Sequence, residues 1–227
     1  MNYTFQFDQV LAAWPQLLQG TWVTIQLSFL AMIIGLAVAI VCAWGKTSGP
    51  APLRFVINAY IELIRNTPFL VQLFFFFFAL PAVGLRWSPQ TAALVAMVVN
   101  LGAYATEIIR AGIESIHRGQ LEAAECLGLS RTQTYLHVII RPALERVYPA
   151  LSSQYVLLML ASSILSSVGV EELFGMANRI QSDTFRNFEV FVVLGILYLF
   201  LAVVVRAGFS LLGLALFPRR RKLGTPL

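Results

Sequence analysis

The amino-acid sequence predicts an all-α integral membrane protein, and three observations support this fold class. The chain has 227 residues, of which 58% are hydrophobic and only 12% are charged, with a mean hydropathy of +0.76. A soluble domain usually carries about 25% charged residues. Apolar runs near the ~20 residues that cross a bilayer as a helix recur along the chain, and they are too long for barrel strands. The basic residues lie beside these runs, as they do at the ends of membrane spans.

We expect a single transmembrane domain over residues 1–227 with five helical spans. The approximate spans are 20–44, 66–85, 88–109, 147–170 and 189–216. The first lies within the charge-free run from Gln9 to Gly45, and the second is also free of charge. A polar segment, residues 110–146, separates the third span from the fourth. The fifth span contains Arg206 in its interior.

The second span is expected to be interrupted near its start. Residues Tyr60 to Arg65 favour a helix, but Asn66-Thr67-Pro68 follows. A proline has no backbone donor and disfavours helix at the residue before it. Broken helices at membrane depth occur where they face protein or a water-filled cavity. The phenylalanine run 74–78 is expected to face lipid and fill the core.

Lysines and arginines predict the orientation, because short cytoplasmic loops are enriched in them. With the N-terminus outside, eleven basic residues lie in the inner segments and three in the outer ones. The inner ones are Lys46, Arg54, Arg110, Arg118, Arg131, Arg141, Arg146, Arg219, Arg220, Arg221 and Lys222, and the outer ones are Arg86, Arg179 and Arg186. The polar segment and the C-terminus are therefore predicted to be cytoplasmic. The net charge of +5 is explained by this bias, so nucleic-acid binding is not expected.

The sequence lacks the motifs of an enzyme or a metal site. Gly45-Lys46-Thr47 resembles the end of a phosphate-binding loop, but Ile40 occupies the position of the required first glycine, and a membrane span precedes it. The chain is therefore not expected to bind ATP itself. The two histidines have no cysteine or carboxylate at metal-ligand spacing, so neither a metal site nor a catalytic residue is predicted.

The polar segment 110–146 has the pattern of two helices joined by a turn. Gly119 and Gly128 punctuate it, and residues 120–127 between them favour helix. Ser130 and Gln133 match a capping box, which predicts a second helix from Arg131 to about Ile140, ended or kinked by Pro142. The paired alanines 123 and 124 would leave one face open to a partner's backbone. An ordinary surface hairpin is the alternative.

Polar residues within the spans are candidates for a solute pathway, because ionisable groups at membrane depth are usually functional. These candidates are Glu62, Arg65, Thr67, Asn100, Tyr104, Glu107, Gln154, Ser162 and Ser163. Residues 62 and 65 share a helical face beside the interruption, and residues 100, 104 and 107 share another. Alternatively, Glu62 and Arg65 form a structural pair at the inner surface, and Tyr104 is interfacial.

Several motifs carry a family resemblance. Glu122-Ala123-Ala124-x3-Gly128 resembles the EAA motif of bacterial ABC importer permeases. The stretches 104–113 and 115–120 are similar to the polar amino acid uptake family, which includes histidine, glutamine, glutamate and arginine permeases. Residues 62–72 resemble its second-span signature, although Asn66 stands where glycine is usual. The EAA motif usually ends in Ile-x-Leu-Pro, but here Arg141 occupies the place of the proline, and Pro142 follows one position later. In the fourth span, residues Ala161 to Leu165 stand where the family usually has a charged residue followed by Thr-Ser-Leu.

The resemblance implies a type I ABC importer permease in a bacterial inner membrane, crossing it several times. It implies a cytoplasmic coupling helix between the third and fourth spans, and an ATPase dimer that holds ATP and Mg, so that the chain itself is not an enzyme and carries no cofactor. The implied coupling residues are Gly119, Glu122, Ala123, Ala124, Gly128 and Ser130. Further implied partners are a second permease, identical or homologous, a periplasmic amino-acid-binding protein and a polar amino acid substrate.

Three alternatives remain at this point. An ATP-independent channel or transporter would leave the polar segment without a purpose. An ABC importer permease for a different small solute would share the motifs. A membrane enzyme would need a catalytic set, which the sequence does not contain.

Overall fold

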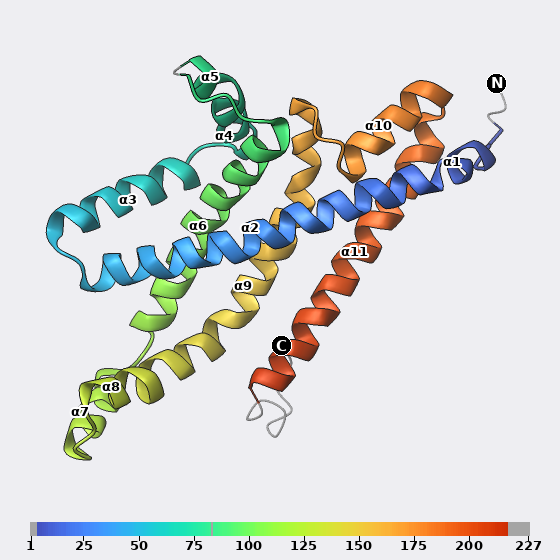
Figure 1. Ribbon diagram of the computed structural model, residues 1–227. Helices are drawn as coiled ribbons and strands as arrows, with labels where there is room; N and C mark the ends of the chain where they lie inside the picture. The colour runs from blue at the N-terminus through green and yellow to red at the C-terminus, as the bar shows by residue number, and fades with distance from the viewer. Residues whose placement is uncertain (1–3, 83, 218–227) are drawn as a thin grey trace.

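The computed structural model describes residues 4–82 and 84–217, and all regular structure in these ranges is helical (Figure 1). Four helices are long and apolar enough to cross a membrane, and a fifth crossing results if one bent pair of helices counts as a single span. The all-α class is therefore confirmed. The basic cluster 219–222 lies outside the described residues.

The N-terminal part is a short helix followed by the longest one. Helix α1 covers Asp8–Ala12, and α2 covers Trp14–Ser48. Proline in the first turn of α2 suits a helix start, because that turn needs no amide donor. Helix α2 packs along α6 (Pro89–Glu114) and crosses in front of α9 (Arg141–Ala161), as Figure 1 shows. It therefore spans the width of the bundle at an angle.

The expected interruption after Arg65 is confirmed. Helix α3 covers Ala51–Arg65 and α4 covers Phe69–Phe74, with a bend of 110° between them. A π-helical turn, Phe75–Ala79, and the short α5, Leu80–Ala82, complete the segment. Helix α3 begins well before Tyr60, so it is longer than the sequence suggested. Within the phenylalanine run, residues 76 and 77 pack on the core, whereas 75 and 78 are exposed.

Helix α6 is the central element of the fold. It contacts α2, α3, α4 and α9, and its small residues allow this close packing. Ala93, Ala96 and Met97 are completely buried in the main core. A side chain at Gly102 would come within 2.7 Å of the Tyr60 hydroxyl, so glycine allows α3 to lie against α6 here.

The polar segment forms α7 (Arg118–Cys126) and the start of a long helical run. This run continues from α8 (Arg131–Gln133) through a π-helical turn, Thr134–Ile140, into α9. The expected helix end at Pro142 is therefore wrong, because the helical run continues through the proline. A proline cannot make the i→i−4 bond of an α-helix, but the wider π-helical turn before it does not use that bond.

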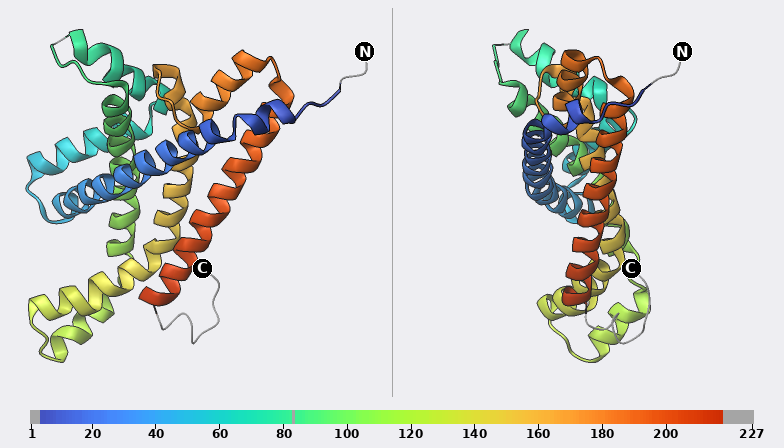
Figure 2. Two further views of the ribbon diagram at one scale, coloured as in Figure 1. Left: turned by 45° about the vertical axis from the view of Figure 1, so that its right-hand side comes forward. Right: turned by 90° about the vertical axis from the view of Figure 1, so that its right-hand side faces the viewer.

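The last part of the chain covers the end of the molecule opposite α7. A 3₁₀ segment, Ser162–Val168, leads from α9 to α10 (Leu173–Thr184) and then to α11 (Asn187–Leu216). Leu17, Ile180 and Val190 belong to a second core at this end. Figure 2 shows α7 and α8 at one end of the molecule and α5 and α10 at the other.

Candidate functional site

Helix α7 and the turn after it form a compact unit. Gly128 adopts φ +70°, a left-handed conformation that suits glycine, and it reverses the chain between α7 and α8. Ser130 then accepts a hydrogen bond from the Gln133 amide at 3.3 Å, and the Gln133 side chain accepts one from the Ser130 amide at 2.9 Å. The capping box predicted from the sequence is confirmed. Gly119, expected to precede the helix, lies instead within its first turn.

The exposed face of α7 differs from the one expected. Ala123 is exposed, but Ala124 is only 3% exposed and faces the protein. The expectation that the two alanines form one outward face is wrong, because successive helical residues point about 100° apart. The outward face instead comprises Gly119, Glu122, Ala123, Cys126 and Leu127. Leu127 is 78% exposed and was not among the residues predicted from the sequence. An apolar residue beside a turn glycine in a polar segment could have indicated a contact surface.

Two anchors hold the polar segment to the spans. Arg146 of α9 donates to the Ser115 carbonyl at 2.5 Å and to its hydroxyl at 2.8 Å. Ser115 lies directly after α6, so this contact closes the segment that contains α7. Ala124 is buried on the inner side of α7, which packs against the π-helical turn before α9. Helix α7 is therefore joined to both α6 and α9.

A charge cluster joins α2 to α6 near the same end. The Lys46 ammonium lies 2.5 Å from one oxygen of Glu107, and the Arg110 guanidinium lies 2.8 Å from the other. Arg110 also pairs with Glu114. The Glu107 side chain is 17% exposed. Glu107, a pathway candidate, thus lies in a cluster of ion pairs, and the structure does not bring it together with Glu62.

The interruption between α3 and α4 is held by Gln72, which is 5% exposed. Its amide nitrogen donates to the Ile64 carbonyl at 2.8 Å and to the carbonyl and hydroxyl of Thr67, both at 3.0 Å. Its oxygen accepts from Asn100 of α6 at 3.0 Å. Thr67 and Asn100, two pathway candidates, therefore share one partner. Gln72 was not among the candidates predicted from the sequence. An amide side chain within a run of apolar residues could have indicated a buried hydrogen-bonding role.

Arg65 and Tyr104 are in direct contact. The guanidinium carbon lies 5.5 Å from the centroid of the tyrosine ring, within the range of a cation–π interaction. Glu62 is exposed, and in residues 4–82 and 84–217 its side chain forms no ion pair with Arg65. The alternative of a structural Glu62–Arg65 pair is therefore wrong for the described chain.

The candidates on the fourth span have different environments. Ser162 is completely buried and donates to the Met159 carbonyl at 2.6 Å, and Ser163 donates to the Leu160 carbonyl at 2.9 Å. Both hydroxyls are thus satisfied within their own helix. Gln154 is half-buried, and its side chain makes no hydrogen bond to any described residue. Only Gln154 among these three has a free polar group.

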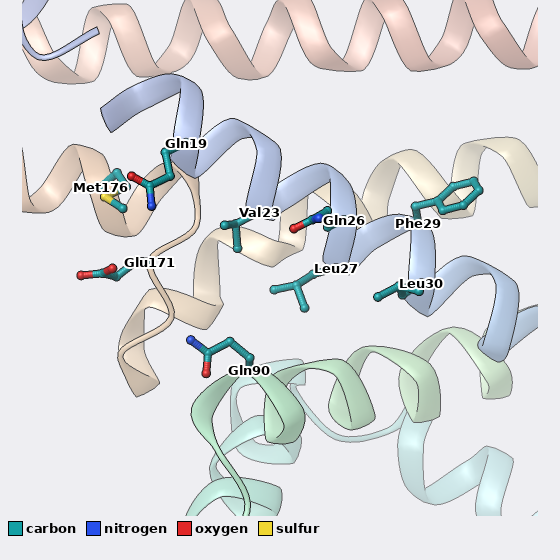
Figure 3. A pocket seen from close by; sticks show the side chains of 9 residues that line it. All are labelled: Gln19, Val23, Gln26, Leu27, Phe29, Leu30, Gln90, Glu171 and Met176. Carbon is teal, nitrogen blue, oxygen red and sulfur yellow. The ribbon is translucent and has the colours of Figure 1, made fainter. Parts of the chain in front are cut away.

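The opposite end of the molecule holds a cavity of about 580 Å³ with both apolar and polar lining residues. Figure 3 shows its polar lining residues, Gln19 and Gln26 from α2, Gln90 from α6 and Glu171. Nearby Glu172 is completely buried and caps α10, accepting from the Phe174 and Gly175 amides at 2.8 Å and from the Tyr198 hydroxyl at 3.0 Å. Burial raises the pKa of the Glu172 carboxyl above its ordinary value, and these hydrogen bonds partly oppose the rise.

Within the described residues, no group of three or more histidine, cysteine or carboxylate side chains could hold a metal. Both cysteines are free. His117 and His137 are exposed. The described residues therefore offer helices long and apolar enough to span a membrane, an exposed helix at one end and polar groups along α3.

Comparison with known proteins gives consistent matches over most of the chain. Residues 31–219 match the family of binding-protein-dependent transport system inner membrane components. The glutamine transport system permease protein GlnP of Escherichia coli (strain K12) is 36% identical over 88% of this chain and 93% of its own length. The L-cystine transport system permease protein TcyB of Bacillus subtilis (strain 168) is 40% identical over 74% of this chain and 71% of its own length.

Solved structures match as well. A chain of an amino acid ABC transporter with histidines superposes with a TM-score of 0.87 at 34% identity, covering 93% of this chain and 99% of that one. A chain of the inward-facing MetNI methionine ABC transporter superposes with a TM-score of 0.72 at 20% identity, covering 88% and 95%. The second match indicates a shared fold alone.

Proposed function

Because the chain belongs to the family of binding-protein-dependent transport system inner membrane components, we propose that it is the permease subunit of an ATP-driven importer for a polar amino acid. A binding protein outside the membrane delivers the amino acid, and the permease moves it inward by alternating access. The names of the relatives and the likeness to an amino acid ABC transporter support this substrate class.

The outward face of α7 docks on the ATPase. This proposal rests on one observation above all: a helix with an exposed Glu122, Ala123 and Leu127 stands at the end of the molecule and is anchored to two long helices. Because the Arg146–Ser115 contact links α9 to the end of α6, a shift of α7 is passed to both. ATP and Mg are bound by the ATPase dimer, and this chain supplies the lever.

The coupling residues have separate roles in this proposal. Glu122 contributes charge at the ATPase contact, and Ala123 allows close approach. Ala124 packs α7 against the protein, Gly119 lies in its exposed first turn, Gly128 makes the turn, and Ser130 caps the following helix. The alanines thus work on opposite sides of the helix.

The solute pathway runs past the end of α3. A zwitterionic amino acid needs a donor for its carboxylate and an acceptor for its ammonium group, and Arg65 and Glu62 provide these. Tyr104 positions Arg65. Thr67 and Asn100 act through Gln72, which keeps the chain interrupted at this point. Gln154 offers a further polar contact from α9, whereas Glu107, Ser162 and Ser163 keep neighbouring structure in place.

The proposed location of the protein is a bacterial inner membrane, with its N-terminus outside and α7 in the cytoplasm. It pairs with a second permease, either an identical copy or a homologue. The surplus of basic residues near α7 and the ends of α2 and α11 supports this orientation.

Reconstitution in liposomes tests the proposal. The chain is co-expressed with its ATPase and binding protein and reconstituted with them. Uptake of radiolabelled amino acids is then followed with and without ATP in the lumen of the liposomes. Uptake that requires ATP, the ATPase and the binding protein is expected. Equal uptake without the ATPase would indicate a channel or a secondary transporter. Uptake of another small solute, with no uptake of any amino acid, would contradict the proposal that the substrate is a polar amino acid.

A further inference from the structure

Helix α3 carries a polar stripe along one side. The stripe consists of Arg54, Asn58, Glu62 and Arg65, which are spaced four, four and three residues apart. This spacing places all four on one face of a helix. Each of them is exposed. Over the eleven helical steps from Arg54 to Arg65, the stripe is about 16 Å long.

The other two sides of α3 are apolar and differ from each other. Ile57, Ile61 and Ile64 are 7%, 3% and 7% exposed and form the side that packs on the protein. Phe55 and Leu63 are 75% and 66% exposed and form a third side. One side of α3 therefore faces the bundle, one has the character of a lipid contact, and the polar stripe lies between them.

The stripe has almost no partners within the chain. In the described residues, the side chains of Arg54, Asn58 and Glu62 make no hydrogen bond or ion pair, and Arg65 only stacks on Tyr104. Helices α3 and α4 together are apolar enough to form one broken span. Charged groups at such depth face water or another protein, because lipid cannot solvate them.

We propose that the whole polar stripe lines the water-filled solute pathway, so that Arg54 and Asn58 contact the transported amino acid together with Glu62 and Arg65. This inference rests on the proposed function and extends it by two residues. The charges alternate along the stripe, with a guanidinium at each end and a carboxylate between them. The substrate carboxylate can therefore pair with Arg65 or, further along the stripe, with Arg54, and its ammonium group can pair with Glu62 between them.

The interruption of the helix beside the stripe favours a stripe that faces a water-filled pathway over one that forms a subunit interface. Gln72, held by Asn100, bonds the Ile64 and Thr67 carbonyls from the protein side. Asn66 and Thr67 bond the Glu62 and Leu63 carbonyls from within the turn itself, so no other described helix covers the stripe side. An interruption of this kind is found where backbone lines a cavity. The stripe also joins the interruption directly, since Arg65 is the last residue of α3.

Thiol labelling of the assembled transporter tests this inference. Cys42→Ser and Cys126→Ser remove the native thiols, and single variants Asn58→Cys and Glu62→Cys are compared with Phe55→Cys and Leu63→Cys on the third side of the same helix. The probe is a charged, membrane-impermeant methanethiosulfonate added to both sides of open membranes. We expect the two stripe positions to react at least ten times faster than the two controls, because the reagent and the thiolate both need water. A mixture of the common amino acids without cysteine, whose thiol would consume the probe, should slow the reaction at the stripe positions only.

Uptake provides the second measurement. Asn58→Leu should lower amino acid uptake at least tenfold, while Phe55→Leu leaves it unchanged. Equal labelling of stripe and control positions would overturn the inference. So would protected stripe positions whose introduced thiols cross-link two permease copies on oxidation, because the stripe would then be a subunit interface. In both cases ATP-driven uptake by the parent transporter would persist, whereas its absence would count against the proposed function itself.

Discussion

Arg146 of α9 holds Ser115 at the end of α6 through two hydrogen bonds, 2.5 Å to its carbonyl and 2.8 Å to its hydroxyl. The two residues are 31 positions apart in the chain and enclose α7 between them. Such a closure makes the long connection between α6 and α9 part of the helical framework. In the proposed coupling to the ATPase, this closure lets α7 move together with α6 and α9 rather than as a loose loop.

Arg146→Ala should weaken this coupling. Hydrogen bonds from a charged donor contribute about 1.5–3 kcal/mol, and the exposed setting places this pair at the lower end. We expect faster proteolysis within residues 118–140 and a severalfold fall in ATP-driven uptake, with the permease still in the membrane. Arg141→Ala is the matched control, because the Arg141 side chain has no partner among the described residues. Equal losses in both variants would assign the effect to surface charge.

Gly128→Val should destabilise the turn after α7. A left-handed backbone costs about 1–2 kcal/mol for a residue with a Cβ. No atom lies within 4 Å of a Cβ placed there, so the backbone conformation alone carries the cost. Gly128→Asn should be tolerated, because asparagine enters this region more readily. Coupling is measured as stimulation of the ATPase by the permease, and an unaffected valine variant would contradict the role given to the turn.

Gln72→Leu should destabilise the interruption between α3 and α4. The substitution leaves Asn100 and the Ile64 carbonyl without their buried partner, at a cost of roughly 1–3 kcal/mol per unsatisfied group. A lower unfolding temperature in detergent is expected from tryptophan fluorescence. The exposed Gln90 provides the control variant Gln90→Leu. If the two variants unfold at the same temperature as the parent, Gln72 does not hold the interruption.

Leu127→Asp should weaken binding of the ATPase without unfolding α7. Leu127 is 78% exposed in the isolated permease, so the change affects only what covers it in the complex. Burying a leucine side chain contributes about 1.5–3 kcal/mol, which corresponds to a loss of roughly ten- to a hundredfold in affinity. Leu136→Asp, 50% exposed outside α7, serves for comparison. Binding is measured by titrating detergent-purified permease with the ATPase, and equal losses would mean that α7 is not the specific contact.

Glu172 should make the protein less stable as the pH rises. Its folded-state pKa lies above the ordinary 4.5 because the carboxyl is buried, so the folded state holds the proton more tightly than the unfolded state. Between pH 4.5 and the raised pKa, stability from this group is therefore lost with increasing pH. Glu172→Gln should flatten the dependence of the unfolding temperature on pH over this window. A variant with the parent's slope would assign that slope to other groups.

The local features of the fold could be predicted from the sequence because neighbouring residues decide them. Proline and its preceding residue predicted the interruption after Arg65, and a serine and a glutamine three residues apart predicted the cap at Ser130. Hydrophobicity over windows of a span's length predicted helices in a membrane. Each of these effects acts within about one helical turn or within one apolar run.

Contacts between distant residues could not be predicted in this way. Gln72 and Asn100 lie 28 residues apart, and Lys46 and Glu107 lie 61 apart. A single sequence contains no record of which helix faces which, so Asn100 and Glu107 looked alike as pathway candidates. The packing of α6 against its neighbours gave Asn100 an amide partner and gave Glu107 the Lys46 ammonium.

Membership of the membrane class, the position of the interruption and the turn at Gly128 were thus determined by the sequence alone. Only the tertiary structure decided that Ala124 faces inward and that the helix continues through Pro142. It also decided that, among the described residues, the polar side of α3 has no partner other than Tyr104, which contacts Arg65. The physical reason is that a helix has several faces of similar composition. Which of them is buried depends on the elements that pack around it, not on its own residues.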